Sequence, residues 1–136
     1  MAALISGWKE YTLSDELSKL PPNVQERLLR LQQLQQTLQS ILAQKQQVDM
    51  EKNEVEQTLA ELAKTADDAV IYKAIGSLLV KAEKAKVTED LNERKSLLET
   101  RSTVIARQEE RIKAQVKEAQ TKLQEDLSPV SGQPLS

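Results

Sequence analysis

The sequence contains no cysteine and no histidine, and these two absences exclude several kinds of chemistry. Without cysteine the chain forms no disulfide and has no thiolate. Without histidine it lacks the commonest general base and the commonest metal ligand. The remaining residues show no phosphate-binding loop, no metal-ligand cluster and no catalytic triad. We therefore expect no enzyme activity, no cofactor and no bound metal.

Aromatic residues are also scarce: the 136 residues include no Phe, one Trp and two Tyr. A large globular core is hard to build from such a chain, and its length allows one domain. Ala, Leu, Glu, Lys, Gln and Arg dominate, which is typical of long helices and coiled coils. The 19 basic and 21 acidic residues are closely mixed. Nucleic-acid binding needs concentrated positive charge, so we do not expect it here.

Long apolar segments are missing too. No stretch approaches the roughly 20 apolar residues of a membrane span. Residues Met1 to Trp8 lack the basic run and long apolar segment of a signal peptide. We therefore expect no membrane association and a cytoplasmic location.

A heptad repeat begins at Val24 and continues for about six heptads. We expect a helix from about residue 22 to residue 64, with Pro22 in its first turn, where proline is tolerated. Nine of the twelve seam positions are apolar, which indicates a coiled coil. The a positions are Val24, Leu31, Leu38, Lys45, Lys52 and Leu59. The d positions are Arg27, Leu34, Ile41, Val48, Val55 and Leu62.

A second helical pattern follows, from about residue 87 to residue 127. Two helices of matched length with a short connector predict an antiparallel hairpin. One register pairs Leu62 with Leu91, Val55 with Leu98, Val48 with Ile105, Ile41 with Ile112 and Leu34 with Ala119. Residues 1–20 form an N-terminal extension, expected to be partly disordered or a short helix. The Pro-, Gly- and Ser-rich residues 128–136 are expected to be disordered.

The stretch "VIYKAIGSLLVKAEKAKV" (Val70 to Val87) has no helical stripe. Gly76-Ser77 matches the loop of a type II′ turn, so we predict a β-hairpin at about residues 69–84. A lone hairpin is marginal in water and exposes two edges. It either folds back to cap the coiled coil or joins hairpins of other subunits in a shared sheet. We favour assembly, through Val70, Ile71, Tyr72, Ile75, Gly76, Leu78, Leu79 and Val80.

The order of these segments resembles a known family. The motifs "YKAIG" and "LLVK" at the hairpin, "LQQLQQ" and "QKQQV" before it, and "RQEERIKAQVKEAQTKLQ" after it are similar to beta-type prefoldin subunits of archaea. The resemblance covers about residues 20–127. The segment Met1 to Lys19 is longer than this family leads us to expect. The implied fold is mainly α, a long antiparallel two-helix coiled coil with a small β-hairpin at the connecting end.

The resemblance implies a chaperone subunit that uses no ATP. Two alpha-type and four beta-type subunits would join through their hairpins into a hexamer. The free ends of the coiled coils would hold non-native proteins and pass them to a group II chaperonin. The expected client-binding residues are Val24, Leu28, Leu31, Val116, Leu123 and Leu127. Inner ones such as Leu31 can equally be ordinary seam residues, paired within the hairpin.

Two alternatives remain open from the sequence. The first is a structural or adaptor coiled-coil protein that self-associates without binding clients. A continuous rod, however, has no use for Gly76 or for a β-rich interruption between two helices. The second alternative is a homo-oligomer of this chain, with the hairpins closing a ring without alpha-type partners.

Overall fold

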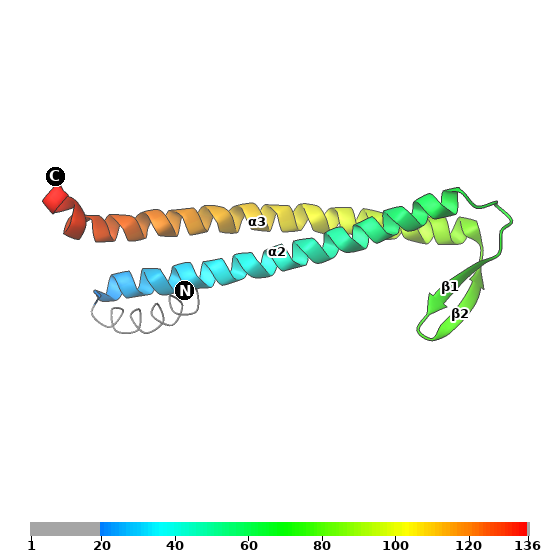
Figure 1. The fold of residues 1–136 in the computed structure, drawn as a ribbon, viewed down its shortest axis with the longest axis horizontal. Helices are drawn as coiled ribbons and strands as arrows, with labels where there is room; N and C mark the ends of the chain where they lie inside the picture. The colour runs from blue at the N-terminus through cyan, green and yellow to red at the C-terminus, as the bar shows by residue number, and fades with distance from the viewer. Residues whose placement is uncertain (1–19, 136) are drawn as a thin grey trace, which may run out of the picture. The chain divides into compact units, whose positions relative to one another are not determined.

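The computed structural model describes residues 20–135. The elements follow in the order α2 (Pro22–Ala63), β1 (Ile71–Ile75), β2 (Leu78–Ala82) and α3 (Lys84–Leu135) (Figure 1). Two long helices joined through a two-stranded hairpin confirm the fold expected from the sequence. The expectations for residues 1–19 lie outside the described part of the chain.

Helix α2 begins where the prolines predict. The carbonyl of Pro21 accepts hydrogen bonds from the backbone N–H groups of Val24 (3.0 Å) and Gln25 (3.1 Å). Pro22 is the first helical residue, where its missing N–H costs nothing. The side-chain amide of Gln25 also donates to the carbonyl of Leu20 at 2.8 Å. These bonds fix the start of the helix.

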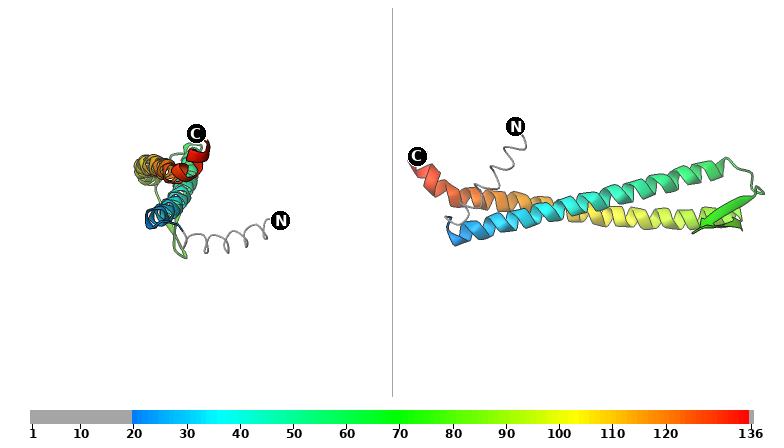
Figure 2. Two further views of the ribbon diagram at one scale, coloured as in Figure 1. Left: turned by 90° about the vertical axis from the view of Figure 1, so that its left-hand side faces the viewer. Right: turned by 60° about the horizontal axis from the view of Figure 1, so that its bottom comes forward.

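The chain divides into two compact units. The hairpin unit comprises Ser40–Glu109, and the terminal unit comprises the described residues before and after it, 20–39 and 110–135. Within the hairpin unit, α2 and α3 lie side by side in both sets of views (Figures 1 and 2).

The core of the hairpin unit is the predicted apolar seam. Leu98 of α3 has no exposed surface, and Val55, its predicted partner, is 9% exposed. The other buried apolar residues of this unit are Ile41, Val48, Leu62 and Ile105. All five apolar d positions of α2 are buried, the fifth being Leu34 in the terminal unit. The helical period therefore predicted the buried d positions, whereas the predicted a positions Leu31, Leu38 and Leu59 are only half-buried.

The hairpin also forms as predicted. Strands β1 and β2 pair antiparallel, from Ile71 opposite Ala82 to Ile75 opposite Leu78. Gly76 has a φ of 59°, and no other described residue has a positive φ. This places glycine at the first central position of a type II′ turn, where a side chain would be strained.

Helix α3 is longer than the sequence predicted. It begins at Lys84 rather than near residue 87, because Lys84, Ala85 and Lys86 are good helix formers. It continues to Leu135, whereas we expected it to fade near residue 127 and to be followed by a disordered tail. Pro129 lacks a donor, but its fixed φ is helical, so the backbone continues through it.

Candidate functional site

The β-hairpin presents large apolar side chains on both of its faces. Directly paired residues share a face, so Ile75, Leu78 and Val80 lie on one side, and Tyr72 and Leu79 lie on the other. Leu79 is 72% exposed and Leu78 is 66% exposed. A lone two-stranded hairpin is marginal in water, and exposed apolar surfaces of this kind are typical of interaction sites. The hairpin is therefore a candidate binding surface.

All eight residues that the sequence assigned to assembly lie in or next to this hairpin. Val70 immediately precedes β1, and Gly76 forms the turn. Ile71 is half-buried at the base of the strand. The exposed apolar members are Val70, Tyr72, Ile75, Leu78, Leu79 and Val80. The structure thus brings the predicted assembly residues together.

A groove at the base of the hairpin was not predicted. Its volume is about 410 Å³, and its walls come from both helices and from β1. Lys73 and Asp90 lie on its rim, with Nζ and Oδ2 4.0 Å apart. The lining residues are Thr58, Leu62, Ile71, Tyr72, Lys73, Val87, Asp90 and Leu91. Because they are spread over three elements, no local sequence pattern reveals them.

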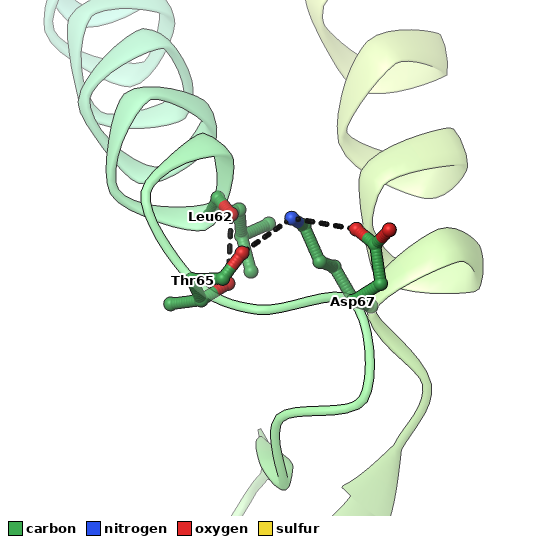
Figure 3. Close-up of polar contacts among 4 residues, drawn as sticks. Leu62, Thr65 and Asp67 are labelled. Carbon is green, nitrogen blue, oxygen red and sulfur yellow. Dashed lines mark hydrogen bonds and ion pairs between the residues drawn. The ribbon is translucent and has the colours of Figure 1, made fainter.

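A lysine joins the end of α2 to the start of α3 (Figure 3). The Nζ of Lys84 donates to the carbonyl of Thr65 at 2.7 Å and lies 3.2 Å from Oδ1 of Asp67. The hydroxyl of Thr65 donates to the carbonyl of Leu62 at 2.7 Å. The lysine thus binds a carbonyl just beyond the C-terminal end of α2, close to where the helix dipole favours a cation. No sequence pattern indicated this contact, since 19 positions separate its two ends.

Polar residues also cross the seam of the hairpin unit. Lys45 contacts Glu109 with 3.0 Å between Nζ and Oε1, and Glu109 is only 9% exposed. Arg94 donates from Nη2 to Oε2 of Glu51 at 2.7 Å. The hydrogen bond from the side chain of Gln47 lowers the pKa of Glu51 below its ordinary 4.5, and Arg94 lowers it further. Polar contacts of this kind help to fix coiled-coil register.

The predicted client-binding residues all lie in the terminal unit, at different depths. Val24 is buried, at 3% exposure, whereas Leu127 is 42% exposed. The four half-buried members are Leu28, Leu31, Val116 and Leu123. Most of these apolar side chains are therefore incompletely covered, and Val24 is the buried exception.

An ion pair holds the two helices together in this unit. Arg27 occupies a d position, and its Nε lies 2.9 Å from Oδ2 of Asp126. Its Nη1 also donates to the carbonyl of Lys122 at 3.0 Å. A groove of about 380 Å³ lies nearby, lined by Arg27, Arg30, Leu34, Gln115, Glu118, Ala119 and Lys122. An arginine thus stands at a seam position that an apolar residue would ordinarily occupy.

Neither helix of residues 20–135 is both long enough and apolar enough to cross a lipid bilayer. In the same part of the chain, no three Asp or Glu side chains lie close enough to hold a metal ion.

Comparison with known proteins decides what kind of molecule carries these surfaces. A family model described as "Prefoldin subunit" matches residues 25–129. The chain belongs to the prefoldin family. Prefoldin subunit beta of Methanothrix thermoacetophila is 43% identical over 109 residues, which is 80% of this chain and 91% of the relative. Prefoldin subunit beta of Archaeoglobus fulgidus is 43% identical over 116 residues, or 85% of this chain and 100% of the relative.

A solved prefoldin structure agrees. The crystal structure of the prefoldin beta subunit from Thermococcus strain KS-1 has a TM-score of 0.74 and 39% identity. It covers 79% of this chain and 94% of that one. The predicted resemblance to beta-type prefoldin is therefore confirmed. Membership implies a prefoldin-family chaperone subunit that assembles with other prefoldin subunits.

Proposed function

We propose that this chain is the beta-type subunit of an ATP-independent cytoplasmic holdase. Four copies join two alpha-type subunits through their β-hairpins. The free ends of the coiled coils capture non-native proteins and deliver them to a group II chaperonin. The chain itself performs no catalysis.

The observation that carries this proposal is the exposed hairpin. Its apolar side chains face solvent on both sides of the sheet, and Leu79 alone is 72% exposed. Both strands are also edge strands with unpaired backbone groups. Pairing with hairpins of other prefoldin subunits would bury the apolar side chains and also pair the free backbone groups. Assembly also brings several coiled coils together, so weak individual contacts with a client add through effective concentration.

The terminal unit has the properties that client binding requires. Among residues 20–39 and 110–127 of this unit, only Val24 and Leu34 are buried apolar side chains. The Arg27–Asp126 pair is partly exposed, with side chains 38% and 20% exposed. Partly exposed pairs contribute about 1 kcal/mol or less. Opening this end of the seam therefore requires little free energy and offers half-buried leucines and valines to a client.

The rival function is a structural or adaptor coiled coil that self-associates without clients. Prefoldin membership makes the chain part of a chaperone family, and a rigid adaptor gains nothing from the half-buried apolar residues of the terminal unit. A homo-oligomer closed by its own hairpins differs from the proposal in composition only. The stoichiometry of the assembly separates these possibilities.

The test is native mass spectrometry of the full chain, alone and mixed with an alpha-type prefoldin subunit. We expect a complex with two alpha-type subunits and four copies of this chain. That complex should suppress aggregation of a heat-unfolded protein without ATP. Added group II chaperonin should then release the bound protein to refold. A chain that ignores the alpha-type subunit and leaves aggregation unchanged would contradict the proposal.

A further inference from the structure

We propose that Lys84 is a positioning residue that holds the β-hairpin in the orientation needed for assembly. This inference rests on the proposed function, in which the hairpin is the surface that joins subunits. The latch consists of Lys84, the carbonyl of Thr65 and the carboxylate of Asp67 (Figure 3).

The latch forms where α2 unwinds. Helix α2 ends at Ala63, and its last turn tightens through hydrogen bonds from Lys64 N to Glu61 O and from Thr65 N to Leu62 O, both 3.1 Å. The ammonium group of Lys84 donates to the carbonyl of Thr65, two residues beyond the end of α2, and this places a positive charge close to the negative end of the helix dipole.

The position of the latch in the chain gives it control over the hairpin. Asp67 lies shortly before β1, which begins at Ile71, and Lys84 follows β2, which ends at Ala82. The side chain of Lys84 therefore connects the segment after β2 to the segment between α2 and β1. The connector between α2 and β1 also contains one backbone hydrogen bond, from Ala69 N to Ala66 O at 3.1 Å. One backbone hydrogen bond restrains the connector only locally, so several of its backbone dihedral angles can still change.

Burial makes the two partners unequal. The side chain of Lys84 is 17% exposed, whereas that of Asp67 is fully exposed. The stem of Lys84 is covered by protein, which leaves the side chain few alternative positions, although its hydrogen bonds to Thr65 and Asp67 are themselves exposed. Asp67 can exchange its bond for water. The carbonyl of Thr65 is therefore the partner that fixes Lys84, and Asp67 supports it.

Loss of the latch should affect assembly more than folding. The buried seam is built from other residues, such as Leu98 and Val55, and does not include Lys84. Without the latch the hairpin can reorient about its connectors. Ordering it again on assembly costs conformational entropy, and this weakens binding. Lys84 therefore acts by preorganising a surface that it does not itself form.

The test compares Lys84→Met with Lys86→Met in the full chain. Both changes remove one ammonium group from the first turn of α3 and keep a similar apolar stem. Lys86 is the matched control, because it pairs with Asp90 four residues along the same helix. Amide hydrogen exchange of the isolated chain and native mass titration with an alpha-type subunit are measured for each.

For Lys84→Met we expect exchange of the strand amides, residues 71–82, to accelerate about tenfold, with the amides around Val55 unchanged. Assembly should weaken by about the same factor, in line with the loss of one charged hydrogen bond. Lys84→Arg should keep both the hydrogen exchange of the strands and the assembly near their wild-type levels. Equal effects in Lys86→Met, or unchanged hairpin exchange in Lys84→Met, would overturn the inference. The exchange measurement needs no partner, so it tests the latch even if the wild-type chain fails to assemble.

Discussion

Leu97 and Leu98 are neighbours in α3, yet Leu98 is 0% exposed and Leu97 is 51% exposed. Replacing Leu98 with Ala removes buried methyl groups and leaves a cavity in the middle of the seam. We expect the free energy of unfolding to fall by about 2–5 kcal/mol. Chemical denaturation monitored by circular dichroism at one fixed protein concentration measures this change.

The adjacent leucine supplies the control. Leu97→Ala makes the same chemical change at an exposed site, so it should alter the free energy of unfolding by only a few tenths of a kcal/mol, roughly the range of surface substitutions. If both variants lost stability equally, Leu98 would not occupy the centre of the seam, and the pairing register of the two helices would be wrong.

Glu51 provides a second prediction, on pH. The hydrogen bond from Gln47 and the ion pair with Arg94 lower the pKa of Glu51 in the folded chain. A lowered carboxyl pKa contributes stability above the ordinary value of 4.5, and this contribution is lost as the pH falls through the folded-state pKa. Glu51→Gln should therefore lower the Tm at pH 7, and the difference from wild type should vanish in strong acid.

Thermal unfolding at several pH values checks this prediction. Glu56→Gln is the matched control, because the side chain of Glu56 is exposed and makes no hydrogen bond or ion pair with residues 20–135. A Tm difference for Glu51→Gln that persists unchanged into strong acid would show that the carboxylate is not the cause.

Single residues also show where sequence reasoning stops. The burial of Val48, Val55 and Leu98 follows from the seven-residue spacing alone, because a helix places such residues on one side. The Lys84 contact does not follow, since it depends on how the connector folds between distant positions. The lysine–glutamate contact between Lys45 and Glu109 lies between these cases. Spacing identified Lys45 as a polar seam position, but only the structure identifies its partner.

At the scale of the elements, the hairpin depends on one backbone conformation. Gly76 has a φ of 59°, and a Cβ added there would meet no atom within 4 Å. Gly76→Ala is therefore sterically free but strained, by about 1–2 kcal/mol. We expect faster hydrogen exchange in β1 and β2 and weaker assembly with an alpha-type subunit, while the helices keep their stability.

Asparagine is the informative comparison at this turn, because it tolerates a positive φ better than alanine. Gly76→Asn should keep more of the hairpin protection and more of the assembly. If alanine and asparagine behaved identically and like wild type, the type II′ geometry would not be required for the hairpin.

The boundaries of the elements were predictable to different degrees. The sequence placed the start of α2 at about residue 22, and the helix begins at Pro22, because proline lacks a donor that the first helical turn does not use. The end of α3 was not, because a proline disfavours a helix without forbidding it, and the backbone continues through Pro129. A helix boundary is thus easier to predict where the local sequence strongly favours it than where the sequence only disfavours continuation.

At the scale of the molecule, the two units carry different surfaces. The hairpin unit has a well-buried seam and an exposed apolar hairpin, which suits permanent assembly. The terminal unit has half-buried apolar residues and a partly exposed ion pair, which suits transient contact with clients. A chaperone that must release its clients needs weak contacts that add across several copies. Assembly and client binding should therefore be separable by substitution.

The variant that tests this separation replaces four apolar residues of the terminal unit with Ser. The substituted residues are Val24, Leu28, Leu123 and Leu127. We expect the complex with the alpha-type subunit to keep its stoichiometry, because the hairpin is unchanged. Suppression of aggregation should weaken by an order of magnitude or more, since the loss at one chain multiplies across the copies in the complex. Native mass spectrometry and light scattering of a heat-unfolded client measure the two properties.

The matched control places four serines on exposed apolar residues of the hairpin unit, namely Leu42, Met50, Leu97 and Val104. It replaces as many large apolar side chains with serine but leaves the terminal unit intact, so aggregation suppression should stay near the wild-type level. Because Val24 is buried, circular dichroism of both variants must show that the helices persist. Equal loss of suppression in the two variants would mean that clients are held along the whole coiled coil, and that the terminal unit has no special part in binding them.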